Sequence, residues 1–234
     1  MKMLSRILTL VAALTVISGT ALPALGGTEL VFRGYAKYVS GTPDAVGAVM
    51  EIYGVLGTAT GTITPIDVDL QTNEYTIAVT GMTVTSVFDQ PSPARRTVSY
   101  GAGQLQIYAQ AIATGTAADF GLPATFTDGE MILGGDVLAD CIAQLFDFDG
   151  DGLYSGSADG GADFDAGTQL SAMEAAGYDL TGWNFNGTLA DPDVGAGVTV
   201  PAGYDRVFDI LLTPPREPSP VEAASWGRIK NLYQ

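Results

Sequence analysis

Apolar and polar side chains alternate along most of the first half of the chain, which is the period expected of a β-strand with one buried face. Residues 66–70 alternate in this way, and after a polar turn at 71–74 the alternation returns at 75–79 and continues past Gly81 to Phe88. The first two segments predict a β-hairpin. Further strands are expected at 30–39, 48–56, 97–100, 104–111, 125–133, 136–146, 183–189 and 205–212.

Many short strands separated by glycine and turn residues are typical of all-β domains. We therefore predict an all-β fold, an antiparallel sandwich or jelly-roll-like domain at 27–212. Helical character is confined to the C-terminal tail and to 165–176, where Leu170 and Met173 are three residues apart and Gly177 follows as a C-terminal stop. The domain is thus expected to carry one short helix.

The N-terminus contains the three parts of an export signal in the expected order. Lys2 and Arg6 precede an apolar run at 7–17, and small residues follow. We predict a signal peptide at 1–26 and a mature chain that begins near Gly27 and is secreted to the extracellular space or the cell surface. The apolar run is too short for a membrane span, so no integral membrane span is expected in the mature chain.

The C-terminal sequence predicts a Pro-rich linker at 213–219 and an amphipathic helical tail at 220–234. The tail begins with a capping box. Two roles for this tail remain open. It is either a tag read by a sorting or surface receptor through Trp226, Ile229 and Tyr233, or a helix that packs on the domain.

The charge of the chain is strongly one-sided. No Lys or Arg occurs between Thr97 and Asp205, where sixteen acidic residues lie. Without Lys2 and Arg6, eight basic residues face 26 acidic ones, a net charge of −18. This balance argues against a nucleic-acid partner and against docking onto anionic lipid, because both need a positive surface.

The residue types also limit the chemistry. The chain has no histidine, which excludes Ser-His-Asp and Cys-His catalysis. Cys141 is the only cysteine, so no internal disulfide forms, and its apolar neighbours predict a buried thiol. No catalytic motif is recognisable, and we expect a non-enzymatic protein.

One acidic run carries the pattern of a calcium loop. Asp147, Asp149 and Asp151 stand at positions 1, 3 and 5, and a glycine stands at position 6, where the chain must turn sharply. Leu153 at position 7 would supply a backbone carbonyl, and Ser155 at position 9 would hold a bridging water. Over about a dozen residues the chain resembles the EF-hand and dockerin type of calcium loop. The resemblance implies Ca²⁺ as the bound ion.

The loop departs from that pattern at position 12, where Ala158 replaces the bidentate Glu. Asp159, Asp163 and Asp165 are the nearest carboxylates that could close the shell or hold a second ion. The alternative is a solvated acidic turn with no metal.

The β-rich, acidic chain with its Pro-linked tail resembles secreted β-domain proteins of the bacterial cell surface that carry C-terminal sorting tags. We therefore expect a calcium-stabilised structural or adhesive protein of a surface layer, filament or matrix. The alternative is a carbohydrate-binding module or accessory domain of a secreted glycoside hydrolase. Its candidate sugar-stacking residues are Trp183, Trp226, Tyr35, Tyr38 and Tyr108.

An unpaired strand edge can accept a strand from another molecule. We therefore also expect self-association through edge strands. Leu30 and Phe32, just after the predicted cleavage site, make the mature N-terminus the candidate donor strand.

Overall fold

The structure is a computed structural model that describes residues 29–60, 68–91, 94–194 and 199–215. The predicted signal peptide at 1–26 and the predicted helical tail at 220–234, with Trp226, Ile229 and Tyr233, lie outside the described residues.

The described chain consists almost entirely of β-strands. The strands are β1 Glu29–Ser40, β2 Val49–Thr60, β3 Asn73–Pro91, β4 Ala94–Tyr100, β5 Gly103–Ala111, β6 Glu130–Val137, β7 Ile142–Phe146, β8 Ser155–Ala166, β9 Trp183–Ala190 and β10 Arg206–Thr213. A 3-10 helix, η1, spans Pro123–Phe126, and a short α-helix, α2, spans Leu170–Ala175. The helix α2 lies within the segment 165–176 in which one was predicted.

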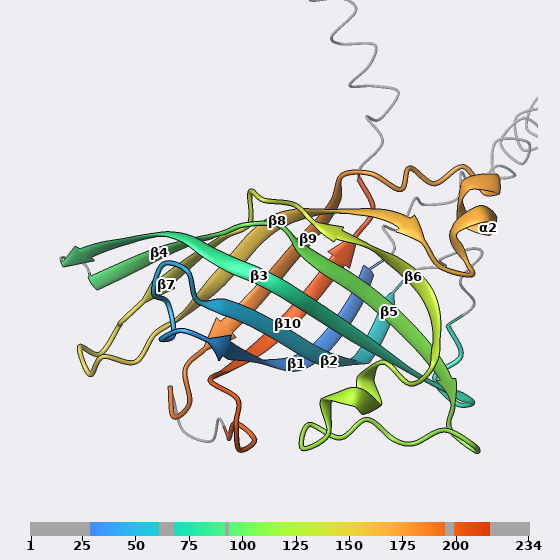
Figure 1. Cartoon of the computed structure of the whole chain (residues 1–234), viewed down its shortest axis with the longest axis horizontal. Helices are drawn as coiled ribbons and strands as arrows, with labels where there is room; N and C mark the ends of the chain where they lie inside the picture. Colours follow the sequence, from blue (N-terminus) through green and yellow to red (C-terminus); the bar gives the residue numbers. More distant parts are fainter. Residues whose placement is uncertain (1–28, 61–67, 92–93, 195–198, 216–234) are drawn as a thin grey trace, which may run out of the picture.

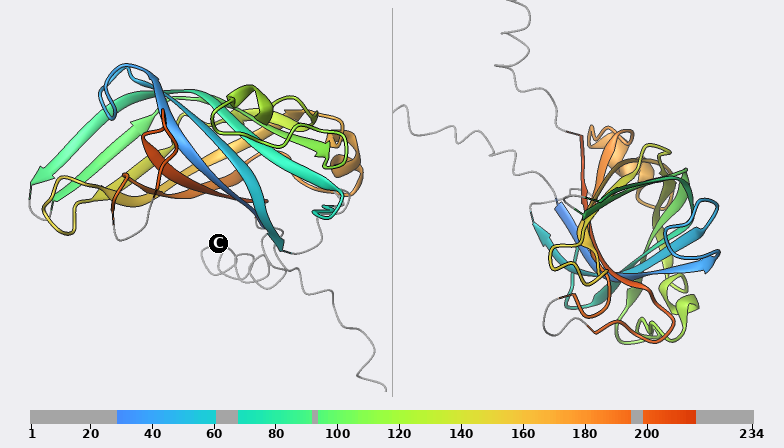
Figure 2. Two further views of the ribbon diagram at one scale, coloured as in Figure 1. Left: turned by 90° about the horizontal axis from the view of Figure 1, so that it is seen from below. Right: turned by 90° about the vertical axis from the view of Figure 1, so that its left-hand side faces the viewer.

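These strands close into an eight-stranded antiparallel β-barrel (Figures 1 and 2). Closure occurs where β1 pairs with β10, with Leu30 opposite Leu212 and Ala36 opposite Arg206. Ten segments make eight strands around the ring because β4 and β5 follow one another along β3, and β7 and β6 follow one another along β8. Neighbours around the ring are therefore neighbours in sequence, which makes the barrel an up-and-down meander.

The predicted sandwich or jelly roll is wrong, although the all-β class is right. Strands of a sandwich and of a barrel both bury one face, so the alternation along the sequence is the same in both. The difference lies in the pairing of β1 with β10, which joins the two ends of the described chain. No local pattern reports such a pairing.

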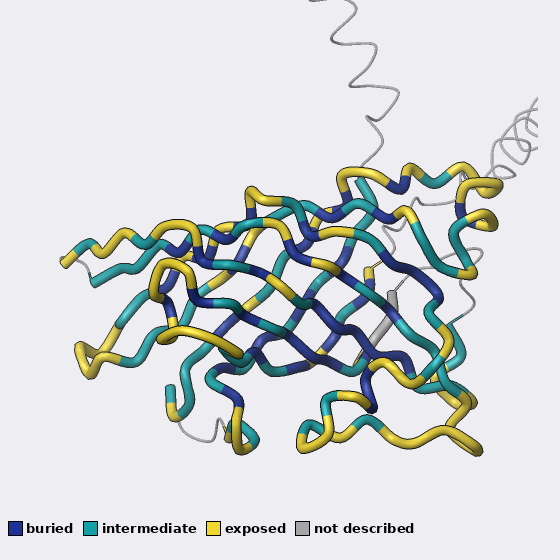
Figure 3. Tube along the Cα trace, viewed as in Figure 1, coloured by how far each residue is buried: buried dark blue, intermediate teal, exposed yellow. Residues whose placement is uncertain are grey.

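Side chains that point inward fill the barrel. Figure 3 shows the buried positions distributed along the strands. Along β10, buried and half-buried residues alternate strictly. The largest buried side chains inside the ring include Trp183, Phe32, Phe185 and Phe208, each no more than 1 % exposed. An eight-stranded ring has an interior just wide enough for such side chains to meet.

A second, smaller hydrophobic cluster lies on the outer wall. The chain between β5 and β6, which contains η1, folds back on β1, β2 and β3, and Phe126 becomes fully buried there. Phe126 packs on Tyr53 (ring centroids 5.4 Å apart) and on Phe120 (4.8 Å). Tyr35 and Tyr204 also belong to this cluster. This outer cluster fixes the β5–β6 connection to the barrel.

Three strand predictions need correction. Residues 68–70, expected as the first arm of a hairpin with 75–79, are not in a strand, whereas the second arm lies within β3. The segment 125–133 begins as η1 and only its end enters β6. The segment 136–146 is broken between β6 and β7 at residues 138–141.

The strand β8 was not predicted. Its sequence is rich in Gly, Ala and Asp, a composition that is typical of an acidic loop. It forms because it is paired on both sides, with β9 along one edge and with β7 and β6 along the other. Its glycines permit this close packing, since a Cβ on Gly156 would collide with the Gln144 carbonyl oxygen. Tertiary pairing thus overrides the low strand propensity of these residues.

Candidate functional site

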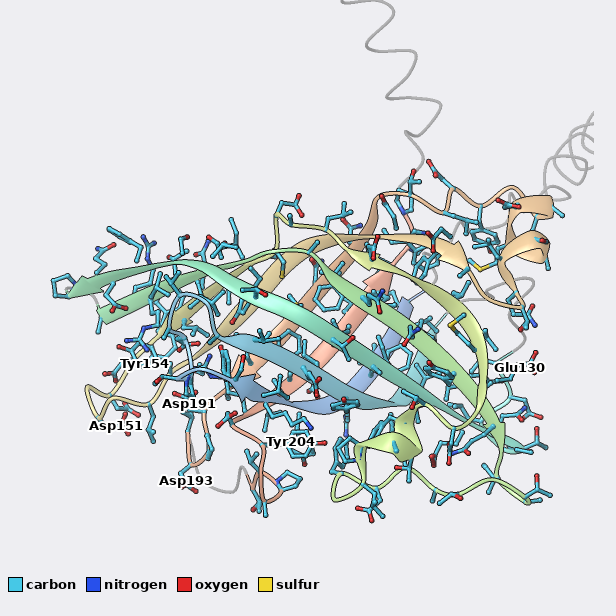
Figure 4. All side chains as sticks on the ribbon, in the orientation of Figure 1. Glu130, Asp151, Tyr154, Asp191, Asp193 and Tyr204 are labelled. Atoms are coloured by element: carbon cyan, nitrogen blue, oxygen red, sulfur yellow. The ribbon has the colours of Figure 1, made fainter. Side chains whose placement is uncertain are left out.

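The acidic run forms the connection between β7 and β8 at one end of the barrel, where Figure 4 labels Asp151. The Asp147 carboxylate accepts backbone hydrogen bonds from Gly150 (2.6 Å) and Gly152 (3.1 Å), and Asp151 Oδ1 accepts one from Leu153 (2.9 Å). Gly150 and Gly152 have φ angles of +73° and +85°, which few residues other than glycine adopt. The run is therefore a tight loop whose shape is fixed by its own carboxylates and glycines.

The predicted ligands separate into two groups. The first group stays in this loop: Asp147 is half-buried, while the Asp149 and Asp151 carboxylates are exposed to solvent. Leu153 follows in the same connection, with its N–H turned to Asp151. These positions share one connection, but the Asp147 carboxylate is turned to the backbone N–H groups of Gly150 and Gly152.

The second group lies on β8, with Ser155 at its start and Asp159, Asp163 and Asp165 further along. At a rise of about 3.3 Å per residue, Asp163 lies roughly 26 Å beyond Ser155, so neither Asp163 nor Asp165 reaches the acidic loop. Asp163 instead accepts a hydrogen bond from the Gly182 N–H (2.7 Å). Among the described residues, no group of three or more His, Cys, Asp or Glu side chains is placed to hold a metal ion.

Among the described residues, the most extensive polar arrangement is one that the sequence did not predict. Asp44, in the turn between β1 and β2, is 5 % exposed and is inserted into the end of the barrel. Arg206 donates two parallel hydrogen bonds of 2.7 Å to its two carboxylate oxygens. Tyr38 donates a third (2.7 Å) and Arg96 a fourth (3.3 Å). We call these residues, together with Tyr100 and Asp191, the Asp44 network.

The network extends outward from Asp44 in two directions. Arg206 Nε donates to Asp191, which also accepts a hydrogen bond from the Tyr154 N–H (2.9 Å). Arg96 forms an ion pair with Asp89 (2.8 Å), and its guanidinium carbon lies 4.8 Å from the centre of the Tyr154 ring. Figure 4 shows Tyr154 and Asp191 at the same end of the barrel as the acidic loop.

The electrostatics of the network favour its charged form. Burial alone would raise the pKa of the Asp44 carboxyl, but the hydrogen bonds and charge of Arg206, with bonds from Tyr38 and Arg96, hold that pKa below its usual range. Burial opposes the charge on Arg206, yet the bonds and charge of Asp44 raise the pKa of its guanidinium. Burial also raises the pKa of Tyr100, to about 12. All of these groups therefore keep one protonation state at neutral pH.

The network closes one end of the barrel, because it joins the β1–β2 turn to β1, β4, β10 and the chain after β9. Asp44 adopts a φ of +57°, an uncommon conformation for a residue other than glycine. The Asp44 carboxylate is buried and already accepts hydrogen bonds from Arg206, Tyr38 and Arg96. This arrangement suits structural closure, and the Asp44 carboxylate is held by its donors.

At the other end of the barrel the interior contains an apolar cavity. Its volume is about 10 Å³, and its walls are Leu30, Phe32, Leu56, Val68, Tyr75, Ile107 and Ile132. A space of this size holds roughly one water molecule. It is too small for a sugar or a lipid chain.

The four described residues proposed for sugar stacking do not form a platform. Trp183 is buried in the core and donates its indole N–H to the Asp179 carbonyl (2.8 Å). Tyr38 belongs to the Asp44 network, Tyr35 packs in the outer cluster, and Tyr108 bonds to Gln106 (3.1 Å). Trp226 lies outside the described residues.

The single cysteine is buried, as its neighbours predicted. Cys141 is 1 % exposed, and burial raises the pKa of its thiol to about 12, with Asp140 and Asp159 adding to the effect. A thiol in this state is a poor nucleophile.

No protein-family model, no curated protein and no solved structure matches this chain. Within the part of the chain that the structure describes, no helix is long and apolar enough to cross a membrane.

Proposed function

We propose that this protein is a non-enzymatic extracellular subunit with a structural or adhesive role in a surface layer, filament or matrix. The observation that carries the proposal is the barrel interior, which is filled by side chains along its length and closed at one end by the Asp44 network. Side chains of the described residues occupy this interior, so the outer surface is left to make the interactions. Export by the N-terminal signal is part of the proposal and rests on the sequence pattern alone.

Calcium binding in the acidic loop is the second part of the proposal. Its support is the loop geometry, in which Gly150 and Gly152 allow the sharp turn while Asp149 and Asp151 remain exposed. An ion there would neutralise carboxylates that otherwise repel one another. The ion would stabilise the β7–β8 connection next to the Asp44 network.

The experiment that tests the role combines surface labelling with a binding screen. Antibody against the barrel should label intact cells that express the full chain, and the purified protein should retain no glycan on a sugar array and turn over no glycoside substrate. Specific glycan retention would replace this proposal with the carbohydrate-binding alternative. Labelling only after the cells are broken would contradict the extracellular location.

A further inference from the structure

The hairpin formed by β3 and β4 projects past the end of the barrel (Figures 1 and 2). The last contacts of β3 on its β2 side are at Val84, whose N–H donates to the Ala48 carbonyl and whose carbonyl accepts from the Gly47 N–H, both at 2.8 Å. Beyond Val84, β4 is the only described strand that pairs with β3. From Thr85 to Asp89 the opposite edge of β3 therefore has no partner among the described strands.

The hydrogen-bond pattern between β3 and β4 determines which backbone groups of β3 point toward this open edge. The Ala94 carbonyl accepts a hydrogen bond from the Asp147 N–H (3.1 Å), so Ala94 and its partner Pro91 turn their backbone groups away from each other. In an antiparallel pair these orientations alternate along the strand. Val87 and Asp89 consequently direct their N–H and C=O groups outward, where no described strand pairs with them.

Two properties of the side chains on this edge favour contact with another molecule. Phe88 is 61 % exposed on the outer face, although its ring is large and apolar. Residues 84–91 and 94–100 contain one acidic residue, Asp89, and two basic ones, Arg95 and Arg96, which gives one net positive charge on a chain of net charge −16. The edge therefore lacks the electrostatic repulsion that would keep two copies of the acidic surface apart.

We propose that this edge pairs with the same edge of a second copy of the chain, antiparallel and about a two-fold axis at Phe88. Val87 of each copy then lies opposite Asp89 of the other, and the two pairs exchange backbone hydrogen bonds in both directions. The two Phe88 side chains meet at the non-hydrogen-bonded position between them, where side chains lie closest. A shift of register would place Asp89 opposite Asp89, or Phe88 opposite Ser86, and both are less favourable.

The edge is bounded on both sides. A β-bulge lies between Val84 and Ser86, and Pro91 has no N–H to donate. Pairing is therefore limited to one short stretch and gives a closed two-fold dimer instead of an open-ended fibre. One such stretch buries less than the roughly 1,200 Å² of a standard stable interface, so the dimer is weak and depends on concentration. The inference goes beyond the proposed function and does not depend on it.

Disulfide trapping tests the register directly. In Phe88→Cys the two thiols would face each other across the axis with Cα atoms about 4.5 Å apart, within the range of a disulfide. The matched control is Thr97→Cys, since Thr97 pairs with Phe88 but lies one strand further from the edge. Mild oxidant should give a cross-linked dimer of Phe88→Cys and none of Thr97→Cys. Equal cross-linking of the two variants, or none of either, overturns the proposal.

The second measurement is the oligomeric state by sedimentation, on the full chain that carries neither cysteine substitution. The wild-type protein should pass from monomer to dimer as its concentration rises through the micromolar range. Phe88→Lys should weaken the dimer by about tenfold or more, because it removes the aromatic pair and opposes two like charges. Phe148→Lys, which changes an exposed ring outside β3, should leave the dimer unchanged. A monomer at every concentration, or a dimer insensitive to Phe88→Lys, contradicts the proposal.

Discussion

Arg206 and Asp44 are 162 residues apart in the sequence and form two parallel hydrogen bonds of 2.7 Å inside the end of the barrel. This bidentate pair joins β10 to the β1–β2 turn and therefore spans the seam where the barrel closes. Buried ion pairs cost desolvation energy, and this one is offset by four charge-assisted or hydroxyl hydrogen bonds to a single carboxylate. Closure of the ring thus depends on charge as well as on strand pairing.

Removal of one partner should reveal this dependence. Arg206→Met leaves the Asp44 carboxylate buried without its main partner, and we expect the free energy of unfolding to fall by about 3–5 kcal/mol. Urea unfolding followed by tryptophan fluorescence measures the change. The control is Arg33→Met on the exposed face of β1, which should change stability by no more than about 0.5 kcal/mol. Equal effects of the two substitutions would show that the ion pair contributes nothing.

The same network predicts how stability depends on acid. The pKa of Asp44 is below its usual range in the folded chain, while the unfolded chain has an ordinary value of about 3.9. The unfolded state therefore binds the proton more readily, and the stability from ionised Asp44 is present above that value and is lost as pH falls through the folded pKa. Between neutral pH and about pH 3, wild-type stability should fall more steeply than that of Asp44→Asn. Parallel curves for the two proteins would refute this assignment.

Much of the strand content follows from the sequence, because alternation at 30–39, 104–111 and 205–212 is a local signal that β1, β5 and β10 reproduce. Closure into a barrel does not follow, since the β1–β10 register is set by residues far apart. β8 was missed for a related reason. Its Gly and Asp residues have low strand propensity, and only pairing on both edges makes them a strand.

The candidate sites show the same division. The acidic loop is recognisable because its ligand spacing is local, and the structure keeps Asp147, Asp149 and Asp151 together in one connection. The Asp44 network could not be predicted from the sequence, because no local pattern connects the segments that contain Asp44 and Arg206. Its one local signal is Asp44 itself, an acid placed in a glycine-rich turn between two apolar strands.

Close packing at β8 gives a prediction about backbone contact. A Cβ at Gly156 would meet the backbone of β7, which cannot move without breaking the sheet. Gly156→Ala should therefore lower the free energy of unfolding by about 1–3 kcal/mol or more. Gly57→Ala is the matched control, because its nearest neighbour would be the Arg33 side chain at 3.6 Å, an ordinary contact. Similar melting temperatures for both variants would contradict the packing of β7 on β8.

Burial of Cys141 predicts slow thiol chemistry. With its pKa raised to about 12, the thiol carries little thiolate at neutral pH and is shielded from reagents. An aromatic disulfide reagent should label the native protein slowly and the urea-unfolded protein at once. Labelling of the native protein should also accelerate in Arg206→Met, because opening of the barrel exposes the thiol. Immediate labelling of the native wild-type protein would show that Cys141 is accessible.

Calcium should raise stability through the acidic loop. An ion that binds only the folded state stabilises it by RT ln(1 + [L]/Kd), about 2.7 kcal/mol at a hundredfold excess over Kd. Chelator should therefore lower the melting temperature, and Asp149→Ala should abolish the difference between calcium and chelator. Asp128→Ala is the control, since it removes an exposed acid from the β5–β6 connection and should leave the calcium response intact. If wild-type protein melts at the same temperature with calcium and with chelator, the loop is an acidic turn stabilised by its own hydrogen bonds to Gly150 and Gly152.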